Sequence, residues 1–292
     1  MTPRWIVAQA LMLNLAVAWP SIANAVPFHF STGDVTNLMA TASRPGSASG
    51  IEIESADDFI LSTPTLINHV TFTGLLVGGN FGNVDLTKTV IEIYRVFPND
   101  SNVARTSGSP TFSTSQVPTR VNSPSDVEFE GRSAADFSIV MASLINPSFT
   151  VQNSVIPGGI HPTPNQTTGG NGSQTGQEVL FDFTLANPFV LPADHYFFVP
   201  QVLLNSGNFL WLSGTRPIVA PGTPFSPDLQ SWTRDANLDP DWLRIGADIV
   251  GVGTFNAAFS LDGQTVPEPS SLLLLASGLA GLAGVTWRRR RT

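Results

Sequence analysis

Oxygen-bearing side chains recur at every second position over one short stretch, and this spacing could serve a metal ion. The residues are Asp235, Asn237, Asp239 and Asp241. Calcium loops place carboxylate and carboxamide oxygens in this alternating pattern. Pro240, however, stands where the sharp turn requires glycine, and Gly246 stands where a bidentate glutamate belongs. Two interpretations therefore stay open, a calcium site and an exposed acidic turn between strands.

Four histidines could supply acid–base chemistry: His29, His69, His161 and His195. None of them lies in an HExxH motif or another metal-ligand spacing. Asp194 precedes His195, but neighbouring residues of a strand point to opposite faces, so these two cannot form a relay. The chain also lacks the GxSxG, phosphate-loop and dinucleotide-binding patterns. We therefore expect a protein without enzymatic activity or organic cofactor, and an exported hydrolase is the third alternative for its function.

Five aromatic residues could stack against sugar rings, as they do in carbohydrate-binding modules: Tyr196, Phe209, Trp211, Trp232 and Trp242. Aromatic side chains at such alternating positions more often belong to a hydrophobic core. We favour the core interpretation and keep a carbohydrate-binding β-sandwich module as the second functional alternative.

The elements that would position these residues are β-strands. The runs in which apolar residues alternate or cluster are 70–75, 90–96, 179–185, 196–199, 201–204, 209–212, 242–245 and 254–261. Clusters of Gly, Pro and Asn separate these runs, which is typical of antiparallel sandwiches and jelly rolls. We predict an all-β domain, an antiparallel β-sandwich or jelly roll, over 26–265. Two segments poor in core-forming residues, 105–128 and 157–177, are predicted to be long surface loops.

Charge separates the middle of the chain from its ends. The 292 residues carry a formal net charge of −8, but 26–265 hold nine basic and 21 acidic residues, a net charge of −12. Such a surface repels a polyanion, so we expect no nucleic-acid partner. The chain contains no cysteine, which excludes disulfides, thiolate metal sites and cysteine nucleophiles.

Residues 1–25 have the order of a secretory signal peptide. Arg4 supplies the positive region, 6–19 form an apolar core that ends before Pro20, and Ala23-Asn24-Ala25 places small residues before Val26. We predict that signal peptidase cleaves here and that the mature protein begins near Val26.

Residues 270–287 are predicted to form a single transmembrane helix. The apolar part, 272–287, carries no charge, and its 16 residues would span roughly 24 Å at ~1.5 Å per residue, slightly short of the ~30 Å hydrocarbon core. Ser270 and Ser271 can extend the helix, and Trp287 suits the membrane interface. The arginines of 288–291 are expected to stay cytoplasmic, which orients the acidic domain away from the cytoplasm.

Three parts follow one another in the last 27 residues. They are Val266-Pro267-Glu268-Pro269, the apolar segment 270–287, and Arg288-Arg289-Arg290-Arg291. This combination resembles the PEP-CTERM sorting signal of exported bacterial proteins. The resemblance implies recognition by exosortase, a membrane-embedded cysteine protease-transpeptidase, and cleavage at or near Pro267–Pro269. The two prolines fix an extended backbone with few hydrogen-bond donors, a conformation suited to a protease.

Together these patterns predict an exported protein of the cell envelope or extracellular matrix. We expect the C-terminal helix to anchor it in the cytoplasmic membrane until exosortase-type processing sends it to the cell surface or the matrix. The predicted role of 26–265 is structural or interactive, without catalysis, and linked to exopolysaccharide.

Overall fold

The computed structural model of the protein describes residues 25–48, 50–105, 117, 119–160, 167–217, 230–266 and 278. One compact unit spans Ala25–Val266. The predicted signal peptide up to Asn24, the residues Pro267–Pro269, the arginines of 288–291 and His161 lie outside the described residues. The predicted transmembrane segment 270–287 also lies outside them, apart from Gly278.

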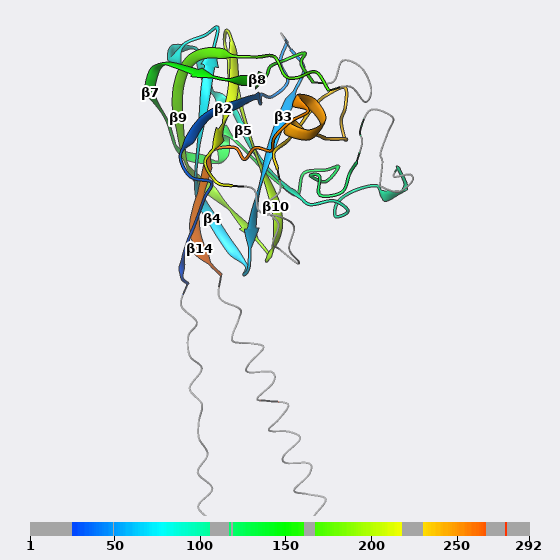
Figure 1. Cartoon of the computed structure of the whole chain (residues 1–292). Helices are drawn as coiled ribbons and strands as arrows, with labels where there is room; N and C mark the ends of the chain where they lie inside the picture. The colour runs from blue at the N-terminus through cyan, green and yellow to red at the C-terminus, as the bar shows by residue number, and fades with distance from the viewer. Residues whose placement is uncertain are drawn as a thin grey trace, which may run out of the picture. The chain divides into compact units, whose positions relative to one another are not determined.

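The larger of two sheets has eight strands (Figure 1). They are β1 (Pro27–Ser31), β2 (Val35–Ala42), β4 (Thr65–Val77), β7 (Phe137–Val151), β8 (Asn153–Val155), β9 (Gln174–Leu191), β11 (Asn208–Gly214) and β14 (Phe259–Thr265). The order β1-β14-β4-β11-β2-β8 forms one path, while β9 pairs with the other edge of β4 and β7 pairs with β9. The long strand β4 is therefore the centre of the sheet.

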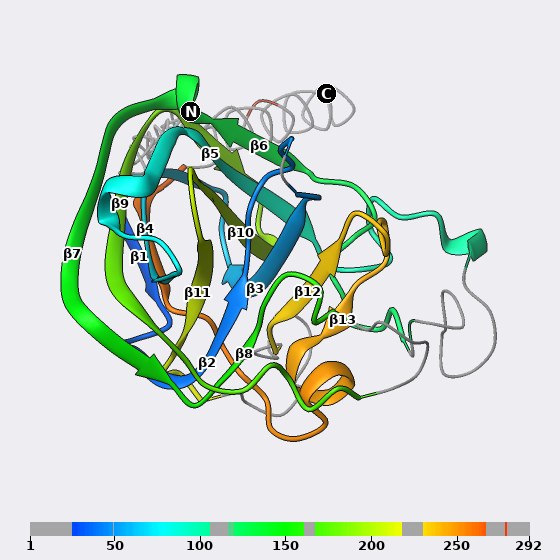
Figure 2. The ribbon, with the colours of Figure 1, turned by 90° about the horizontal axis from the view of Figure 1, so that it is seen from above.

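The smaller sheet has six strands in the order β13-β12-β3-β10-β5-β6. They are β3 (Ile53–Leu61), β5 (Val84–Arg95), β6 (Glu130–Ser133), β10 (Asp194–Leu204), β12 (Trp232–Asp235) and β13 (Leu243–Arg244). Short helical turns connect strands at Phe81–Asn83, Val103–Arg105 and Ala134–Asp136, and one π-helical turn covers Ile245–Val250. Viewed from above, β7 and β9 curve along one side of the domain, and β12 and β13 lie on the opposite side (Figure 2).

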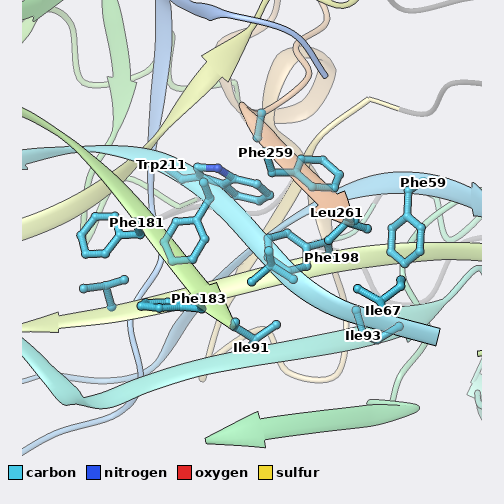
Figure 3. Packing of buried hydrophobic residues seen from close by; sticks show 14 of the residues in the cluster. Phe59, Ile67, Ile91, Ile93, Phe181, Phe183, Phe198, Trp211, Phe259 and Leu261 are labelled. Atoms are coloured by element: carbon cyan, nitrogen blue, oxygen red, sulfur yellow. The ribbon is translucent and has the colours of Figure 1, made fainter. Parts of the chain in front are cut away.

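The two sheets share one hydrophobic core. Alternate residues of β4 and β9, such as Phe72, Phe181 and Phe183, meet Ile93 of β5 and Phe198 of β10 in a single buried cluster. Figure 3 shows the rings of Phe181, Phe183 and Phe198 converging with Trp211 and Phe259. All five aromatic residues considered for sugar stacking are buried, with at most 2% of their surface exposed. The core interpretation of these rings is confirmed.

Gly74 of β4 lies directly under an aromatic ring of this core. A Cβ atom at this position would clash with the ring of Phe209, which is 1% exposed and has no room to move. We expect Gly74→Ala to lower the free energy of unfolding by about 1–3 kcal/mol, because overpacking forces the ring off its preferred position.

Urea denaturation of 25–266 measures this change in the free energy of unfolding. Gly46→Ala is the matched control, since its Cβ would meet only ordinary contacts at 3.7 Å. Equal stability of the two variants would contradict the packing described here.

A second apolar layer covers the other face of the six-stranded sheet. It contains Tyr94, Phe197, Trp232 and Trp242. The described residues between Phe97 and Glu128 contribute to the cover, since the Trp242 indole donates to the backbone carbonyl of Ser125 at 3.1 Å. Residues 105–128 were predicted to be a surface loop, yet Val117, Arg120 and Asp126 in it are buried. Arg120 and Asp126 form an ion pair there, so polar residues make up part of this layer.

The first and last strands of the unit are neighbours. β1 and β14 pair antiparallel from Pro27 opposite Gln264 to Ser31 opposite Ser260. At the end of β14, the backbone amide of Thr265 donates to the carbonyl oxygen of Val26 at 2.8 Å. The backbone amide of Val266 donates to the carbonyl oxygen of Pro64, also at 2.8 Å. The two ends of the unit therefore emerge side by side (Figure 1).

The predicted fold class is confirmed as a predominantly β unit with two sheets. The sheets are not purely antiparallel, because β2 and β8 pair in parallel through Met39–Thr41. The run 242–245 is strand only at Leu243–Arg244, since the π-helical turn begins at Ile245. Over the described part of the chain, no helix has the length and apolar character needed to cross a membrane.

Candidate functional site

One face of the eight-stranded sheet gathers most of the polar side chains that could do chemistry. Val70 and Phe72 of β4, and Phe181 and Phe183 of β9, point into the core. Side chains alternate along a strand, so the residues between them point to the opposite side. We call this side the polar face. Its polar members are His29, Ser31, His69, Thr71, Thr73, Glu178, Asp182, Ser260 and Asp262.

A chain of histidines and carboxylates crosses the polar face over β1, β14, β4 and β9. The Nδ1 of His29 lies 2.6 Å from Oδ1 of Asp262, whose Oδ2 lies 3.1 Å from Nδ1 of His69. The Nε2 of His69 lies 2.9 Å from Oδ1 of Asp182. Each of the four residues comes from a different strand, so the chain ties the sheet together across three strand junctions.

The hydrogen bonds within this row of histidines and carboxylates favour the protonated, charged form of His69. Partial burial alone would lower the pKa of His69, but its hydrogen bonds to Asp182 and Asp262 outweigh that effect and raise it. Burial likewise opposes ionisation of Asp262, whereas the hydrogen bonds from His29 and His69 lower the pKa of Asp262 overall. Both ring nitrogens of His69 face carboxylates, so neither is free to accept a proton from a nucleophile. The geometry suits a cross-strand ion-pair network.

His195 also has a carboxylate partner, but it is not its neighbour in sequence. Its Nε2 lies 2.6 Å from Oδ2 of Asp58, and His195 is only 8% exposed. Asp194 accepts from the backbone amide of His195 at 2.9 Å and so takes no part in a relay. Among the described residues, no Ser or Thr hydroxyl is hydrogen-bonded to a histidine ring. The adjacent Asp57 accepts from the Ser231 hydroxyl at 3.0 Å.

The carboxylates considered for calcium each have a different partner. Asp235 accepts from the amides of Asn237 and Leu238 at 2.9 and 3.1 Å, which closes the turn after β12. Asp239 pairs with Arg234 at 2.8 Å, and Asp241 with Arg105 at 2.7 Å. No group of three or more acidic or histidine side chains in the described residues is arranged to hold a metal ion. Calcium binding at Asp235, Asn237, Asp239 and Asp241 stays a prediction, and it would have to displace these pairs.

A buried ion-pair cluster lies on the covered face of the six-stranded sheet. Arg234 pairs with Glu54 through Nε and, at 3.0 Å, through Nη2. The Tyr94 hydroxyl donates to Glu54 at 2.7 Å and lies 3.2 Å from Oε2 of Glu92. The guanidinium of Arg234 sits 4.3 Å from the ring centre of Trp242. Burial, followed by the negative charges of Glu54 and Glu128, raises the pKa of Glu92 to about 9.

The sequence did not point to this cluster. Glu54 and Arg234 are 180 positions apart, and only the pairing of β3 with β12 brings them together. The one available signal was local alternation, because Glu92 and Tyr94 occupy alternate positions of the predicted strand 90–96. Alternation predicts on which face of the sheet a side chain lies. It does not predict whether another segment of the chain covers that face.

The C-terminal end of β14 leads directly into the segment singled out for sorting. Val266 is the last residue of the compact unit, held by its hydrogen bond to Pro64. Residues 265–291 match the PEP-CTERM protein-sorting motif. The predicted resemblance is confirmed, and the PEP-CTERM motif marks the chain as an exported protein that exosortase sorts. No curated protein and no solved structure matches the chain.

The PEP-CTERM match begins at Thr265, which is also the last residue of β14. It contains Val266, Pro267, Glu268, Pro269 and the arginines 288–291, the residues predicted to carry sorting. The motif shares no residue with the polar face or the ion-pair cluster. It indicates export and sorting, while the two other groups of residues belong to the compact unit Ala25–Val266.

Proposed function

We propose that this chain is a non-catalytic structural or interaction protein of the bacterial cell surface or extracellular matrix, with a role linked to exopolysaccharide. The PEP-CTERM motif at 265–291 supports the route. A signal peptide at 1–25 and an anchoring helix at 270–287 would complete it. In this proposal the anchor holds the protein in the cytoplasmic membrane, with the domain outside, until exosortase cuts.

The observation that carries this proposal is the position of the motif relative to the fold. β14 ends at Thr265, so a cut at or near Pro267–Pro269 would remove no strand from either sheet. β1 and the backbone bonds of Thr265 and Val266 would hold the new end in place. We infer that the released product is an intact β-sandwich, with the shared core between its two sheets. Jelly-roll connectivity stays a prediction.

The two functional alternatives have different support. A carbohydrate-binding module that stacks sugars on its aromatic rings is not favoured, because Trp211, Trp232, Trp242 and Tyr196 are in the core. An exported hydrolase would use His69 or His195, which both lie beside carboxylates. Such an enzyme would still require a nucleophile or an activated water next to one of these rings.

The test of the proposal follows the chain through sorting. The full chain is expressed in a bacterium that contains exosortase, beside a variant with Pro267→Ala, Glu268→Ala and Pro269→Ala. We expect the unaltered chain to be released with its C-terminus at or near Pro267–Pro269, and the variant to stay unprocessed. Intact-mass analysis of the released and membrane fractions distinguishes them.

A second variant, with Arg288–Arg291 replaced by glutamine, tests whether these arginines stop the chain from passing through the membrane. Each arginine costs roughly 2.5–3.5 kcal/mol at a bilayer centre, so removing all four should let the segment slip or sit unstably. We expect this variant to be secreted unprocessed or degraded, with unchanged melting of 25–266. A strain without exosortase is the control. Release of the unaltered chain there with the same trimmed end, or a released form of the unaltered chain that keeps residues beyond Arg288 where exosortase is present, would refute the route.

A further inference from the structure

The polar face contains a hollow of about 440 Å³. Its floor is formed by β4, β9 and β14, with Thr71, Thr73, Glu178 and Ser260 among the lining residues. The turn from β1 to β2, including Asp34, and Ile145 of β7 form its sides. The volume suits a ligand of the size of one or two sugar rings, which falls within the usual range of small-molecule pockets.

Glu178 is the unusual residue of this hollow. It is only 9% exposed, and its carboxylate forms no hydrogen bond or ion pair with the residues that the structure describes. The buried carboxylate of Glu54, by contrast, has both an arginine and a tyrosine as partners. A buried ionised group without a partner is costly, since it loses its hydration and gains nothing in return. Burial accordingly raises the pKa of Glu178.

The lining is acidic and rich in hydroxyl groups. Glu178 and Asp34 are its charged residues, and no Lys, Arg or His occurs among the described residues that line it. Thr71 and Ser260 share a hydrogen bond of 2.7 Å, which leaves each hydroxyl oxygen able to accept from a ligand. Ile145 and Leu180 add apolar contact. A complementary ligand would be cationic at one end and hydroxylated along its body.

An ammonium group fits this hollow better than a metal ion does. Hard metal ions need six or more oxygen ligands, whereas the hollow offers two carboxylates, and the described residues contain no group arranged to hold a metal. A primary ammonium needs only three acceptors, and a charge-assisted bond to a carboxylate is among the stronger hydrogen bonds. Glu178 lies opposite Leu75 of β4, two residues from Thr73, so the Thr73 hydroxyl on the same face can supply a further acceptor.

We propose that this hollow binds a primary ammonium group carried by a hydroxylated ligand, with the ammonium at Glu178 and Thr73 and the ligand hydroxyls at Thr71 and Ser260. The ligand class is an amino sugar; a lysine side chain offers the same ammonium but no hydroxyl groups, so it is an alternative outcome of the test. The site belongs to the domain itself, so the inference does not rest on the sorting route or on a role in the matrix.

Calorimetric titration of the full chain in a mild detergent tests the proposal. The probes are glucosamine, glucose and n-butylamine, which separate the ammonium from the hydroxyls. We expect glucosamine to bind in the millimolar range or tighter, and glucose to bind at least about tenfold more weakly, because it lacks the charge-assisted bond. Glucosamine binding more tightly than butylamine supports an amino sugar. Equal binding of the two would show that the ligand hydroxyls contribute nothing, which points to a simple amine such as a lysine side chain and overturns the proposal.

The matched variants are Glu178→Gln and Glu130→Gln. Glu178→Gln keeps the shape of the side chain and removes its charge, so glucosamine affinity should fall at least about tenfold while the melting temperature holds or rises. Glu130 lies on β6 in the other sheet with its side chain 38% exposed, and its variant should bind unchanged. Equal binding of glucose and glucosamine, unchanged binding by Glu178→Gln, or no binding of either amine would overturn the proposal.

Discussion

Replacing Arg234 by methionine is expected to lower the free energy of unfolding of 25–266 by about 3–5 kcal/mol. The Arg234 side chain is 6% exposed and lies between Glu54 and the ring of Trp242. Removing only the cation leaves the Glu54 carboxylate buried without its charge partner, beside the acidic Glu92. An uncompensated buried charge of this kind is one of the few causes of losses this large.

Urea denaturation measures the loss, and two further variants locate its cause. Lys88→Met breaks the exposed pair of Lys88 and Asp85, which is 3.7 Å long with Lys88 59% exposed, and should change stability by less than about 1 kcal/mol. The double variant Arg234→Met with Glu54→Leu removes both charges and should recover most of the loss. A loss below about 1 kcal/mol in Arg234→Met would show that the pair is not buried as described.

The domain is expected to be more stable at pH 5 than at pH 8, mainly because of Glu92. Burial, with the charges of Glu54, Glu128 and Glu52, raises the pKa of Glu92 from 4.5 to about 9 in the folded state. Between these values the folded state holds a proton that the unfolded state has released. The free energy of unfolding therefore falls as pH rises through this window, by about 1 kcal/mol per pH unit.

Other groups add to or limit this effect in known directions. The pKa of His69 is raised, so its contribution is present at low pH and is lost as pH rises through the folded value. The pKa values of Asp85, Asp136 and Asp262 are lowered, so these groups lose their contribution only in strong acid. The maximum of stability should therefore lie in mildly acidic solution.

Glu92→Gln isolates the main cause of the pH dependence. The variant cannot ionise, so its unfolding free energy should vary much less between pH 5 and pH 8, and it should exceed that of the unaltered domain at pH 8. Glu130→Gln, a variant of a partly exposed carboxylate on β6, should keep the original slope. Urea denaturation at several pH values gives the slopes. Parallel curves for Glu92→Gln and the unaltered domain would contradict a raised pKa at this residue.

Alternation along the chain was enough to predict the central strands. The runs at 70–75 and 179–185 lie within β4 and β9, and the run at 90–96 lies in β5 except for Val96, because each has one face in the core and one face outside it. β7 escaped prediction since apolar residues occur on both of its faces, with Ile139 and Met141 exposed and Phe137 and Val140 against the core. Register shifts near Asn146 break its periodicity further.

The environments of the charged and titratable side chains depend on contacts between distant segments, which no local sequence pattern reveals. His195 was compared with its neighbour Asp194, but its partner is Asp58 on the adjacent strand. The segment 105–128 is poor in apolar residues, yet Arg120 and Asp126 are buried in it because they neutralise each other. Nothing in the local sequence distinguishes Glu178 from other carboxylates on β-strands, because the hollow around it is formed by residues of β4, β7, β9, β14 and the β1–β2 turn together. The sorting motif, in contrast, is contiguous and was predicted from its own residues.

The pairing of β14 with both β1 and β4 determines how the domain responds to tension. A pull on the chain beyond Val266, with the far side of the domain held, acts along the axis of β14. Backbone hydrogen bonds between antiparallel strands lie across that axis, so the bonds to β1 and β4 carry the force together. A pull that separates Val26 from Thr265 would instead open the β1–β14 pair one bond at a time. A tether attached only to the chain beyond Val266 would therefore load the domain in its mechanically stronger direction.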